Sequence, residues 1–281
     1  MAVNFNSQIF EALPDNLALA QRALFYADTL FETVRVFSGK IPLFDRHWNR
    51  LSSGLNALGF QLPDNWNASY FQAEMLKICP PDARARISVW RSPGGLYDPL
   101  DNAPQFLITA QALESSVYEW REPGITLGVV KNVRLPVDAF SNFKTLNAAR
   151  YVAASVEAGK QGCDDALILN SFDRICEATS SNVFWWENGT LCTIPLSEGC
   201  VAGIQREWLL QTARSAGLAV QEKPATFATL QNAGEIFLTN AIRGMTPVGT
   251  FNGRAMETAQ TKRLFTGVVL PAHLTMTSMT Q

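Results

Sequence analysis

The sequence predicts two α/β domains of unequal kind, built on mixed sheets rich in hairpins rather than on a doubly wound parallel sheet. Short stretches of alternating apolar residues recur along the chain, and several are joined by turns that contain glycine. Segments with apolar residues at helical spacing lie between them. The break Glu122-Pro123-Gly124 separates two halves, so we place a small N-terminal domain at residues 1–115, a linker at 116–123 and a larger C-terminal domain at 124–281.

In the N-terminal half, the alternating stretch Leu30–Phe37 is followed by Ser38-Gly39-Lys40 and by Ile41–Phe44, which predicts a hairpin with glycine in its turn. From Asp45 the apolar residues recur at helical spacing until Gly59, which predicts a helix ended by that glycine. The other elements expected here are a helix at Ala68–Ile78, ended by Pro80-Pro81, and strands at Ala85–Trp90 and Gln105–Ala110.

The C-terminal half opens with a predicted strand at Ile125–Val130. A helix is expected from Leu146 to Ala158, with Leu146, Ala149, Val152, Ala153 and Val156 on its apolar face. Asn188-Gly189 is a strong signal for the turn of a hairpin. The remaining expected elements are strands at Ala166–Asn170, Ile175–Ala178, Val183–Trp186, Leu191–Ile194, Ala219–Glu222, Glu235–Thr239 and Val248–Phe251, and helices at Ile204–Ala216 and near Phe227–Asn232.

The composition limits the classes of partner. With 47% hydrophobic and 17% charged residues, the chain has ample material for a core. Its 23 Lys and Arg against 25 Asp and Glu leave no basic surplus for phosphate backbones, which argues against nucleic acid. No apolar run approaches the ~20 residues of a membrane span, and the first residues lack the order of a signal peptide. We therefore expect a cytoplasmic protein with neither a membrane nor a nucleic-acid partner.

The five cysteines contain no Cys-x-x-Cys pair, and the chain has only two histidines, His47 and His273. A zinc site therefore has no ligands at the usual spacing, and we expect no metal and reduced thiols. The histidine count and the absence of Gly-x-Ser-x-Gly also argue against a serine hydrolase.

Two side chains are candidates for chemistry. Lys144 stands in apolar company before a helix of small residues; burial would disfavour its charged form and free the amine as a nucleophile. The alternative is a lysine whose stem packs along apolar surface. Glu177 lies between an apolar strand and a turn rich in hydroxyls, where a carboxylate calls for a cationic partner. Its alternative is an ordinary glutamate at a strand end.

Three segments could bind an anion such as a phosphate. Gly199–Gln205 places glycines and backbone N–H groups at the start of an amphipathic helix, where the helix dipole favours negative charge. Thr239-Asn240-Ala241 follows a strand with several donors in a row. Arg50 could add charge through its guanidinium group, or it could be a solvated surface residue.

These features belong to a longer series of motifs. In order, the chain contains YADTLFETVRV, HWNRL, FKTLNAARYVAA, DDALILN, EATSSNVFWWENGTLCTIP, GIQRE and LTNAIRGMTPVG, from about Tyr26 to Val248. The order and spacing resemble the pyridoxal-phosphate enzymes of fold type IV, the class-IV aminotransferase family, which includes branched-chain and D-amino-acid aminotransferases and aminodeoxychorismate lyases. The resemblance implies a smaller N-terminal α/β domain, a larger C-terminal pseudo-barrel of mixed sheet, pyridoxal 5'-phosphate as cofactor, and a homodimer.

The resemblance also implies roles for individual residues. Lys144 matches the catalytic lysine that forms a Schiff base with the cofactor and moves the substrate proton, and Glu177 matches the carboxylate that faces the ring nitrogen. The other positions implied to bind the cofactor are Arg50, Ser181, Asn182, Gly203, Ile204, Gln205, Thr239 and Asn240. Those implied for the substrate pocket are Phe31, Arg91, Ala241 and Arg243.

The resemblance leaves two reactions open. A transaminase would transfer the amino group of an amino acid to a keto acid, whereas a 4-amino-4-deoxychorismate lyase would release pyruvate and 4-aminobenzoate. Arg91–Tyr97 and Asn240–Val248 look more like the lyases, but Leu96 stands where the lyases carry a second arginine. We therefore favour transamination by a small margin. The other departures are Gln205, at a position where threonine is common, and the missing glycines of Tyr26–Thr29. A scaffold that only binds a phosphorylated ligand is a remote third possibility.

Overall fold

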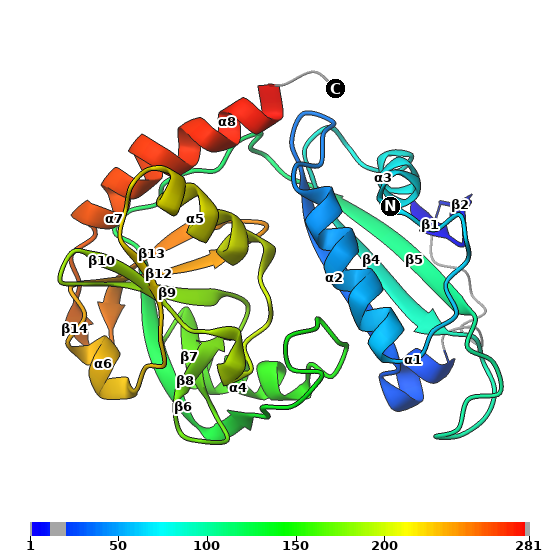
Figure 1. The fold of residues 1–281 in the computed structure, drawn as a ribbon, viewed down its shortest axis with the longest axis horizontal. Coiled ribbons are helices and arrows are strands. Elements are labelled where there is room, and N and C mark those ends of the chain that lie inside the picture. The colour runs from blue at the N-terminus through cyan, green and yellow to red at the C-terminus, as the bar shows by residue number, and fades with distance from the viewer. Residues whose placement is uncertain (1, 12–20, 279–281) are drawn as a thin grey trace. The chain divides into compact units, whose positions relative to one another are not determined.

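The computed structural model describes residues 2–11 and 21–278 and divides the chain into two compact units (Figure 1). Unit 1 comprises Met1–Val117 and the short segment Phe143–Asn147, and unit 2 comprises Tyr118–Asn142 and Ala148–Gln281. The segment that carries Lys144 therefore belongs by its contacts to unit 1, although its neighbours on both sides belong to unit 2. The domain limits derived from the sequence stay a prediction, since compactness does not show which parts fold independently.

Unit 1 is a five-stranded antiparallel sheet in the order β2-β1-β5-β4-β3 (Figure 1). Its strands are β1 (Val3–Phe5), β2 (Gln8–Phe10), β3 (Thr29–Val36), β4 (Ala83–Arg91) and β5 (Pro104–Ala112). Its helices are α1 (Gln21–Tyr26), α2 (Phe44–Ala57) and α3 (Ala68–Leu76).

The core of unit 1 lies between this sheet and the helices α2 and α3. Leu55 of α2 and Phe71 and Met75 of α3 are fully buried, and they belong to one apolar cluster with Ile87 of β4. The helical spacing that begins at Asp45 is therefore confirmed for α2, and the helix expected at Ala68–Ile78 is present as α3.

One predicted strand of unit 1 is wrong. Ile41–Phe44 does not return along β3 as the second strand of a hairpin, and only Phe37 and Lys40 pair, in an isolated bridge. The chain instead turns into α2, which begins at Phe44 after Leu43 adopts a left-handed backbone with φ of 62°. Three apolar residues within four positions fit a strand and the approach to a helix equally well, so the local pattern could not separate them.

Unit 2 is a mixed, strongly curled sheet (Figure 1). The order is β11-β10-β9-β12-β13-β6-β7-β8, with β14 paired to β13. The pairs β10–β11, β13–β6 and β6–β7 are parallel, and the others are antiparallel. The strands are β6 (Ile125–Leu135), β7 (Asp165–Asn170), β8 (Ile175–Ala178), β9 (Asn182–Glu187), β10 (Thr190–Thr193), β11 (Val220–Glu222), β12 (Glu235–Asn240), β13 (Gly244–Phe251) and β14 (Arg254–Ala255).

The predicted α/β class with mixed, hairpin-rich sheets is thus confirmed. The β9–β10 hairpin shows why: Asn188 and Gly189 both have positive φ, 49° and 78°, as a two-residue turn between twisted strands requires. The helical elements of unit 2 are α4 (Ala149–Lys160), η2 (Leu196–Glu198), α5 (Ile204–Ser215), α6 (Phe227–Gln231), α7 (Ala259–Leu264), the π-helical turn η3 (Phe265–Val269) and α8 (Leu270–Ser278).

The predicted apolar face of α4 is wrong. Val152 and Val156 are 60% and 54% exposed, whereas the residues that α4 buries are Ala154 and Ala158. Alanine lets the helix approach β6 and β7 closely, so the small side chains and not the larger ones face the sheet. The helix also begins at Ala149, because Leu146 pairs through its N–H with the Thr29 carbonyl in unit 1.

Among the described residues, no helix has both the length and the hydropathy needed to cross a membrane.

Candidate functional site

Glu177 is the centre of a buried polar cluster in unit 2. It lies in β8 and is 3% exposed. The Tyr151 hydroxyl donates to its Oε1 at 2.7 Å, while Asn182 Nδ2 and the Val201 N–H donate to its Oε2 at 3.2 and 3.1 Å. Hydrogen bonds donated to a carboxylate favour its charged form, so the three donors hold a negative charge at this buried point.

Tyr151 was not singled out in the sequence, yet it makes the shortest of these three hydrogen bonds. It lies in the first turn of α4 and is half-buried. Burial raises the pKa of its hydroxyl, and the charge of Glu177 raises it further, so the hydroxyl keeps its proton and acts as a donor. A tyrosine near a helix start carries no signal in sequence, because its partner lies 26 residues away in another element.

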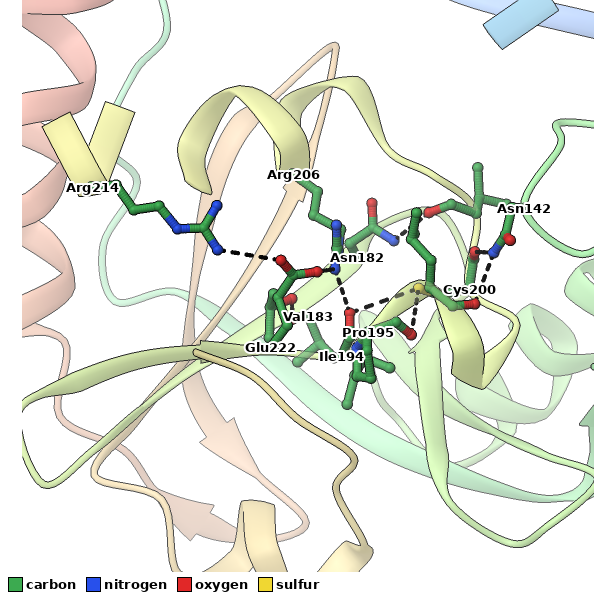
Figure 2. Close-up of polar contacts among 12 residues, drawn as sticks. Asn142, Asn182, Val183, Ile194, Pro195, Cys200, Arg206, Arg214 and Glu222 are labelled. Carbon is green, nitrogen blue, oxygen red and sulfur yellow. Dashed lines mark hydrogen bonds and ion pairs between the residues drawn. The ribbon is translucent and has the colours of Figure 1, made fainter. Parts of the chain in front are cut away.

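Asn182 connects Glu177 to the loop that precedes α5. Its Nδ2 also donates to the Val201 carbonyl at 2.9 Å, and its Oδ1 lies against Gly203, where an added Cβ would approach it to 1.9 Å. Figure 2 shows that Asn142 and Arg206 hold the same loop: Asn142 Nδ2 donates to the carbonyls of Leu196 and Cys200, and Arg206 Nη2 donates to the Ile194 carbonyl.

Helix α5 and strand β12 contact each other, and each carries a buried donor without a partner among the described residues. Gly203 is the N-cap, and no side chain among the described residues caps the helix. Gln205 and Thr239 are 4% and 2% exposed, yet Gln205 Nε2 and Thr239 Oγ1 have no hydrogen-bond partner in the described part of the chain. Buried polar groups are normally paired, and these two donors fit an anionic or polar ligand beside a helix end that favours negative charge.

The loop after β12 lies next to these groups. Asn240 Nδ2 donates to Ser181 Oγ at 2.9 Å, and Asn240 Oδ1 accepts from the N–H groups of Ile242 and Arg243. The Ala241 carbonyl accepts from the Tyr118 hydroxyl at 2.9 Å. Ile204 is buried in the first turn of α5, and Arg243 is exposed. Unit 2 therefore brings together the predicted residues Glu177, Ser181, Asn182, Gly203, Ile204, Gln205, Thr239, Asn240, Ala241 and Arg243.

Lys144 lies in unit 1 beside the edge strand β3. The Phe31 N–H donates to the Lys144 carbonyl at 2.9 Å, and Leu30 and Thr145 form an isolated bridge. The lysine Nζ lies 4.7 Å from the centroid of the Phe31 ring. The backbone of the lysine is thus fixed by a strand, and its amine meets the aromatic side chain that was expected to border the substrate pocket.

Arg50 is held by an acid that the sequence did not single out. Its Nε and Nη2 donate to the two carboxylate oxygens of Glu32 at 2.7 and 2.6 Å, and His47 Nδ1 contacts the same carboxylate at 2.7 Å. Burial raises the pKa of Glu32, but Arg50 and the His47 contact outweigh it and lower the pKa to about 2. Burial lowers the pKa of His47 and so favours the neutral imidazole, whose Nδ1–H donates a hydrogen bond to the Glu32 carboxylate.

The guanidinium group of Arg91 is buried and has several partners within unit 1. Arg91 is 5% exposed, donates to Asp28, Asn102 and the Leu58 carbonyl, and lies over the Phe60 ring.

Arg86, which sequence reasoning missed, has its Cζ 3.8 Å from the centroid of the same Phe31 ring that Lys144 contacts. Phe31 stands opposite Ser88 in the β3–β4 register, so Arg86 lies on its face of the sheet. Arg84 and Arg86 alternate with apolar residues in β4, and this spacing in the sequence could have identified the pair.

No group of three or more His, Cys, Asp or Glu side chains among the described residues could hold a metal ion. The five cysteines of the chain are free thiols.

The known proteins that this chain resembles point to one family. The model of the family "Amino-transferase class IV" matches residues 29–251. The chain is 28% identical over 271 residues to a putative branched-chain-amino-acid aminotransferase of Methanocaldococcus jannaschii, covering 92% of this chain and 91% of the relative. It is also 28% identical over 236 residues to an aminodeoxychorismate lyase of Vibrio harveyi, covering 83% and 86%.

A solved structure shares the fold. The branched-chain aminotransferase of Thermoproteus uzoniensis superposes with a TM-score of 0.82 at 22% identity, covering 95% of both chains. The matched segment runs from β3 to the end of β13 and includes Lys144, Glu177 and the α5 N-terminus. The chain therefore belongs to the class IV aminotransferase family.

Proposed function

We propose that this protein is a pyridoxal-phosphate-dependent transaminase that moves the amino group of an amino acid to a keto acid. The observation that carries the proposal is a pair of buried donors without partners among the described residues. Gln205 Nε2 lies in the first turn of α5, and Thr239 Oγ1 lies in β12 opposite Asn182, whose Oδ1 lies against the α5 N-cap Gly203. A phosphate accepts such donors and is favoured at a helix N-terminus. Gln205 stands where the family commonly has threonine, so an amide group would replace a hydroxyl as the side-chain donor to the phosphate.

The residues of unit 2 fit the two ends of this cofactor. Thr239 stands opposite Asn182 in the β9–β12 register, and Asn182 donates to Glu177. Asn182 therefore connects Glu177 to the proposed phosphate site, which Gln205 and Thr239 define. Ile204 and Gln205 would offer backbone N–H groups to the phosphate, with Ser181 and Asn240 beside them. Arg50 would add its guanidinium, whose plane Glu32 fixes.

Glu177 would keep the ring nitrogen of the cofactor protonated. Its three donors keep the carboxylate ionised, and an ionised carboxylate pairs with a protonated nitrogen. When bound, pyridoxal phosphate supplies an aldehyde that joins amines and a ring that takes up electron density from the carbon losing a proton.

Lys144 would be the catalytic residue. Its amine would hold the cofactor through the aldehyde and would move a proton at the substrate carbon. The strand contacts of its backbone hold the residue in place, and Phe31 would form one wall of the substrate pocket.

An arginine would hold the carboxylate of the substrate. Arg91 was expected in this pocket, but its guanidinium group is already engaged by Asp28, Asn102 and Leu58. Arg86 and Arg243 are the better candidates, because Arg86 lies over the same ring as Lys144 and Arg243 follows Ala241 in the loop after β12.

The second candidate function is an aminodeoxychorismate lyase, since the lyase of Vibrio harveyi is as similar in identity as the putative branched-chain aminotransferase. Transamination is favoured because Leu96 replaces the second arginine of the lyase motif and so removes a cation that a dicarboxylate substrate would need.

A half-reaction screen tests the proposal. Protein loaded with pyridoxal phosphate is mixed with single L- and D-amino acids, small amines or aminodeoxychorismate, and its visible absorbance is followed. A transaminase loses the band with an amino acid and regains it with a keto acid. Release of 4-aminobenzoate from aminodeoxychorismate, with no amino acid changing the band, would establish the lyase instead.

We also propose that the protein acts as a homodimer. Unit 1 exposes large apolar side chains, which often mark an interface: Leu24, Phe25, Leu96, Tyr97 and Leu100. Sedimentation equilibrium of the loaded protein tests this, and a monomer at micromolar concentration would contradict it.

A further inference from the structure

We propose that Tyr151 is a positioning residue that keeps the Glu177 carboxylate ionised. The proton shared between Glu177 and the ring nitrogen of the cofactor then stays on the nitrogen. The inference rests on the proposed function, because it needs a pyridine ring opposite Glu177. It concerns a residue for which the family resemblance implied no role, although Tyr151 lies within the motif FKTLNAARYVAA.

The contact is direct and specific. The Tyr151 hydroxyl donates to Glu177 Oε1 at 2.7 Å, whereas the donors Asn182 Nδ2 and Val201 N–H act on Oε2. Tyr151 therefore controls a different oxygen from the one that the α5 loop controls. Its ring packs against the apolar core of unit 2, which fixes the direction of the hydroxyl.

The energetic effect has a definite sign. A hydrogen bond donated to a carboxylate stabilises the ionised form and lowers the pKa of the acid. Without the Tyr151 donor, the pKa of Glu177 rises, and the shared proton moves from the ring nitrogen towards the carboxylate. The ring then carries less positive charge and withdraws less electron density, so proton loss from the substrate carbon slows.

Tyr151→Phe separates this role from simple packing, since it removes the hydroxyl and keeps the ring. A positive charge on the ring nitrogen disfavours a second positive charge at the nearby link to Lys144, so its loss should raise the pH midpoint of the visible band. For the loss of one hydrogen bond to a charged group we expect a rise of about one pH unit. We expect kcat to fall about tenfold with little change in KM, as for an interaction that matters in the transition state.

Two other variants calibrate the titration. Tyr70→Phe removes a tyrosine hydroxyl that contacts Ser7 in unit 1, and it should leave the midpoint unchanged. Glu177→Gln removes the acid itself and should shift the midpoint further in the direction of Tyr151→Phe. A mere packing role for Tyr151 predicts equal midpoints for Tyr151→Phe and the wild type.

A stronger donor at the same position gives the opposite sign. Site-specific 3-fluorotyrosine at position 151 has a more acidic hydroxyl and should lower the midpoint. The fluorotyrosine variant also tests the inference if Tyr151→Phe does not fold or does not take up cofactor.

Opposite shifts for the phenylalanine and fluorotyrosine variants support the inference, and an unchanged midpoint in both overturns it. A wild-type protein that stays colourless after incubation with pyridoxal phosphate contradicts the proposed function itself, which is a separate result.

Discussion

Thr239 stands directly opposite Asn182 where β12 pairs with β9, and its hydroxyl is buried without a hydrogen-bond partner among the described residues. A chain that leaves a buried hydroxyl unpaired loses stability unless a ligand completes it. Asn182 also donates a hydrogen bond to Glu177, so this one residue connects the Thr239 position to the buried acid.

Thr239→Val tests whether that hydroxyl serves a ligand. We expect the Kd for pyridoxal phosphate to rise about tenfold, because one hydrogen bond to a charged group is lost. The thermal midpoint of the protein without cofactor should stay equal or rise, because an unsatisfied polar group is replaced by a methyl group. Cofactor titration and thermal unfolding measure the two effects.

Thr193→Val is the matched control. The Thr193 hydroxyl is fully buried and donates to the Val183 carbonyl at 2.7 Å, so its loss should lower the thermal midpoint of the cofactor-free protein. If Thr239→Val destabilises the cofactor-free protein as Thr193→Val does, then Thr239 has a structural partner and the proposed phosphate site is placed wrongly.

Gly203→Ala should disturb the cofactor end of unit 2. The new Cβ would lie 1.9 Å from Asn182 Oδ1, so the amide must move and its bonds to Glu177 and the Val201 carbonyl weaken. We expect cofactor affinity to fall at least tenfold, measured by fluorescence titration. At Gly234 an added Cβ meets only the Trp186 carbonyl, at 3.7 Å, so Gly234→Ala should bind cofactor like the wild type. Equal affinity in all three proteins would contradict the role of Asn182.

Unit 1 should lose stability in acid. The folded-state pKa of Glu32 is about 2, below its ordinary 4.5, so its contribution is present above pH 4.5 and is lost as the pH falls towards 2. The contribution is on the order of 3 kcal/mol. The lowered pKa of His47 acts in the same direction from about pH 6.5 downwards, because the unfolded chain takes up the proton more readily.

Denaturant titrations of the cofactor-free protein at several pH values measure this effect. Glu32→Gln should be less stable at pH 7 and should lose less further stability on acidification. A wild-type stability that stays constant from pH 7 to pH 3 would show that the Glu32 network does not titrate with folding.

Tyr118→Phe should loosen the loop that carries Ala241 and Arg243. The Tyr118 hydroxyl holds the Ala241 carbonyl, its ring packs against Gly244, and His273 of α8 lies over that ring at 4.4 Å. Loss of the hydroxyl should raise KM for the amino acid several-fold with a smaller change in kcat.

Limited trypsin digestion provides an independent readout, since Arg243 is exposed. Cleavage after Arg243 should be faster in Tyr118→Phe than in the wild type. Equal cleavage rates together with an unchanged KM would show that the contact does not order the loop.

Local signals in the sequence were sufficient for much of the fold. The Asn188-Gly189 turn and the spacing of α2 depend only on neighbouring residues, and both were predicted correctly. The helices after Phe251 were not anticipated, because Pro271 and the π-helical turn interrupt the usual pattern. The side of α4 that meets the sheet was also missed, since a pattern of apolar residues does not reveal that alanine rather than valine is buried.

Some residues of the candidate site were likewise identified from the sequence, and others were not. Lys144 and Glu177 were singled out from their surroundings, and the resemblance implied their roles, which no contact in the structure tests directly. Arg86 was missed although its alternation with apolar residues in β4 is visible in the sequence. Tyr151 and Glu32 were missed because each becomes informative only through a partner from a different element, Glu177 and Arg50. Such pairings arise from tertiary structure and have no spacing in the sequence.

The most direct test is to locate the covalent attachment of the cofactor. Protein loaded with pyridoxal phosphate is reduced with borohydride, digested, and analysed by mass spectrometry, with Lys144→Ala and Lys131→Ala treated in parallel. We expect the reduced cofactor on Lys144 alone in the wild type and in Lys131→Ala, and none in Lys144→Ala. Attachment at another lysine, or a yellow Lys144→Ala protein that yields the same adduct, would contradict the account.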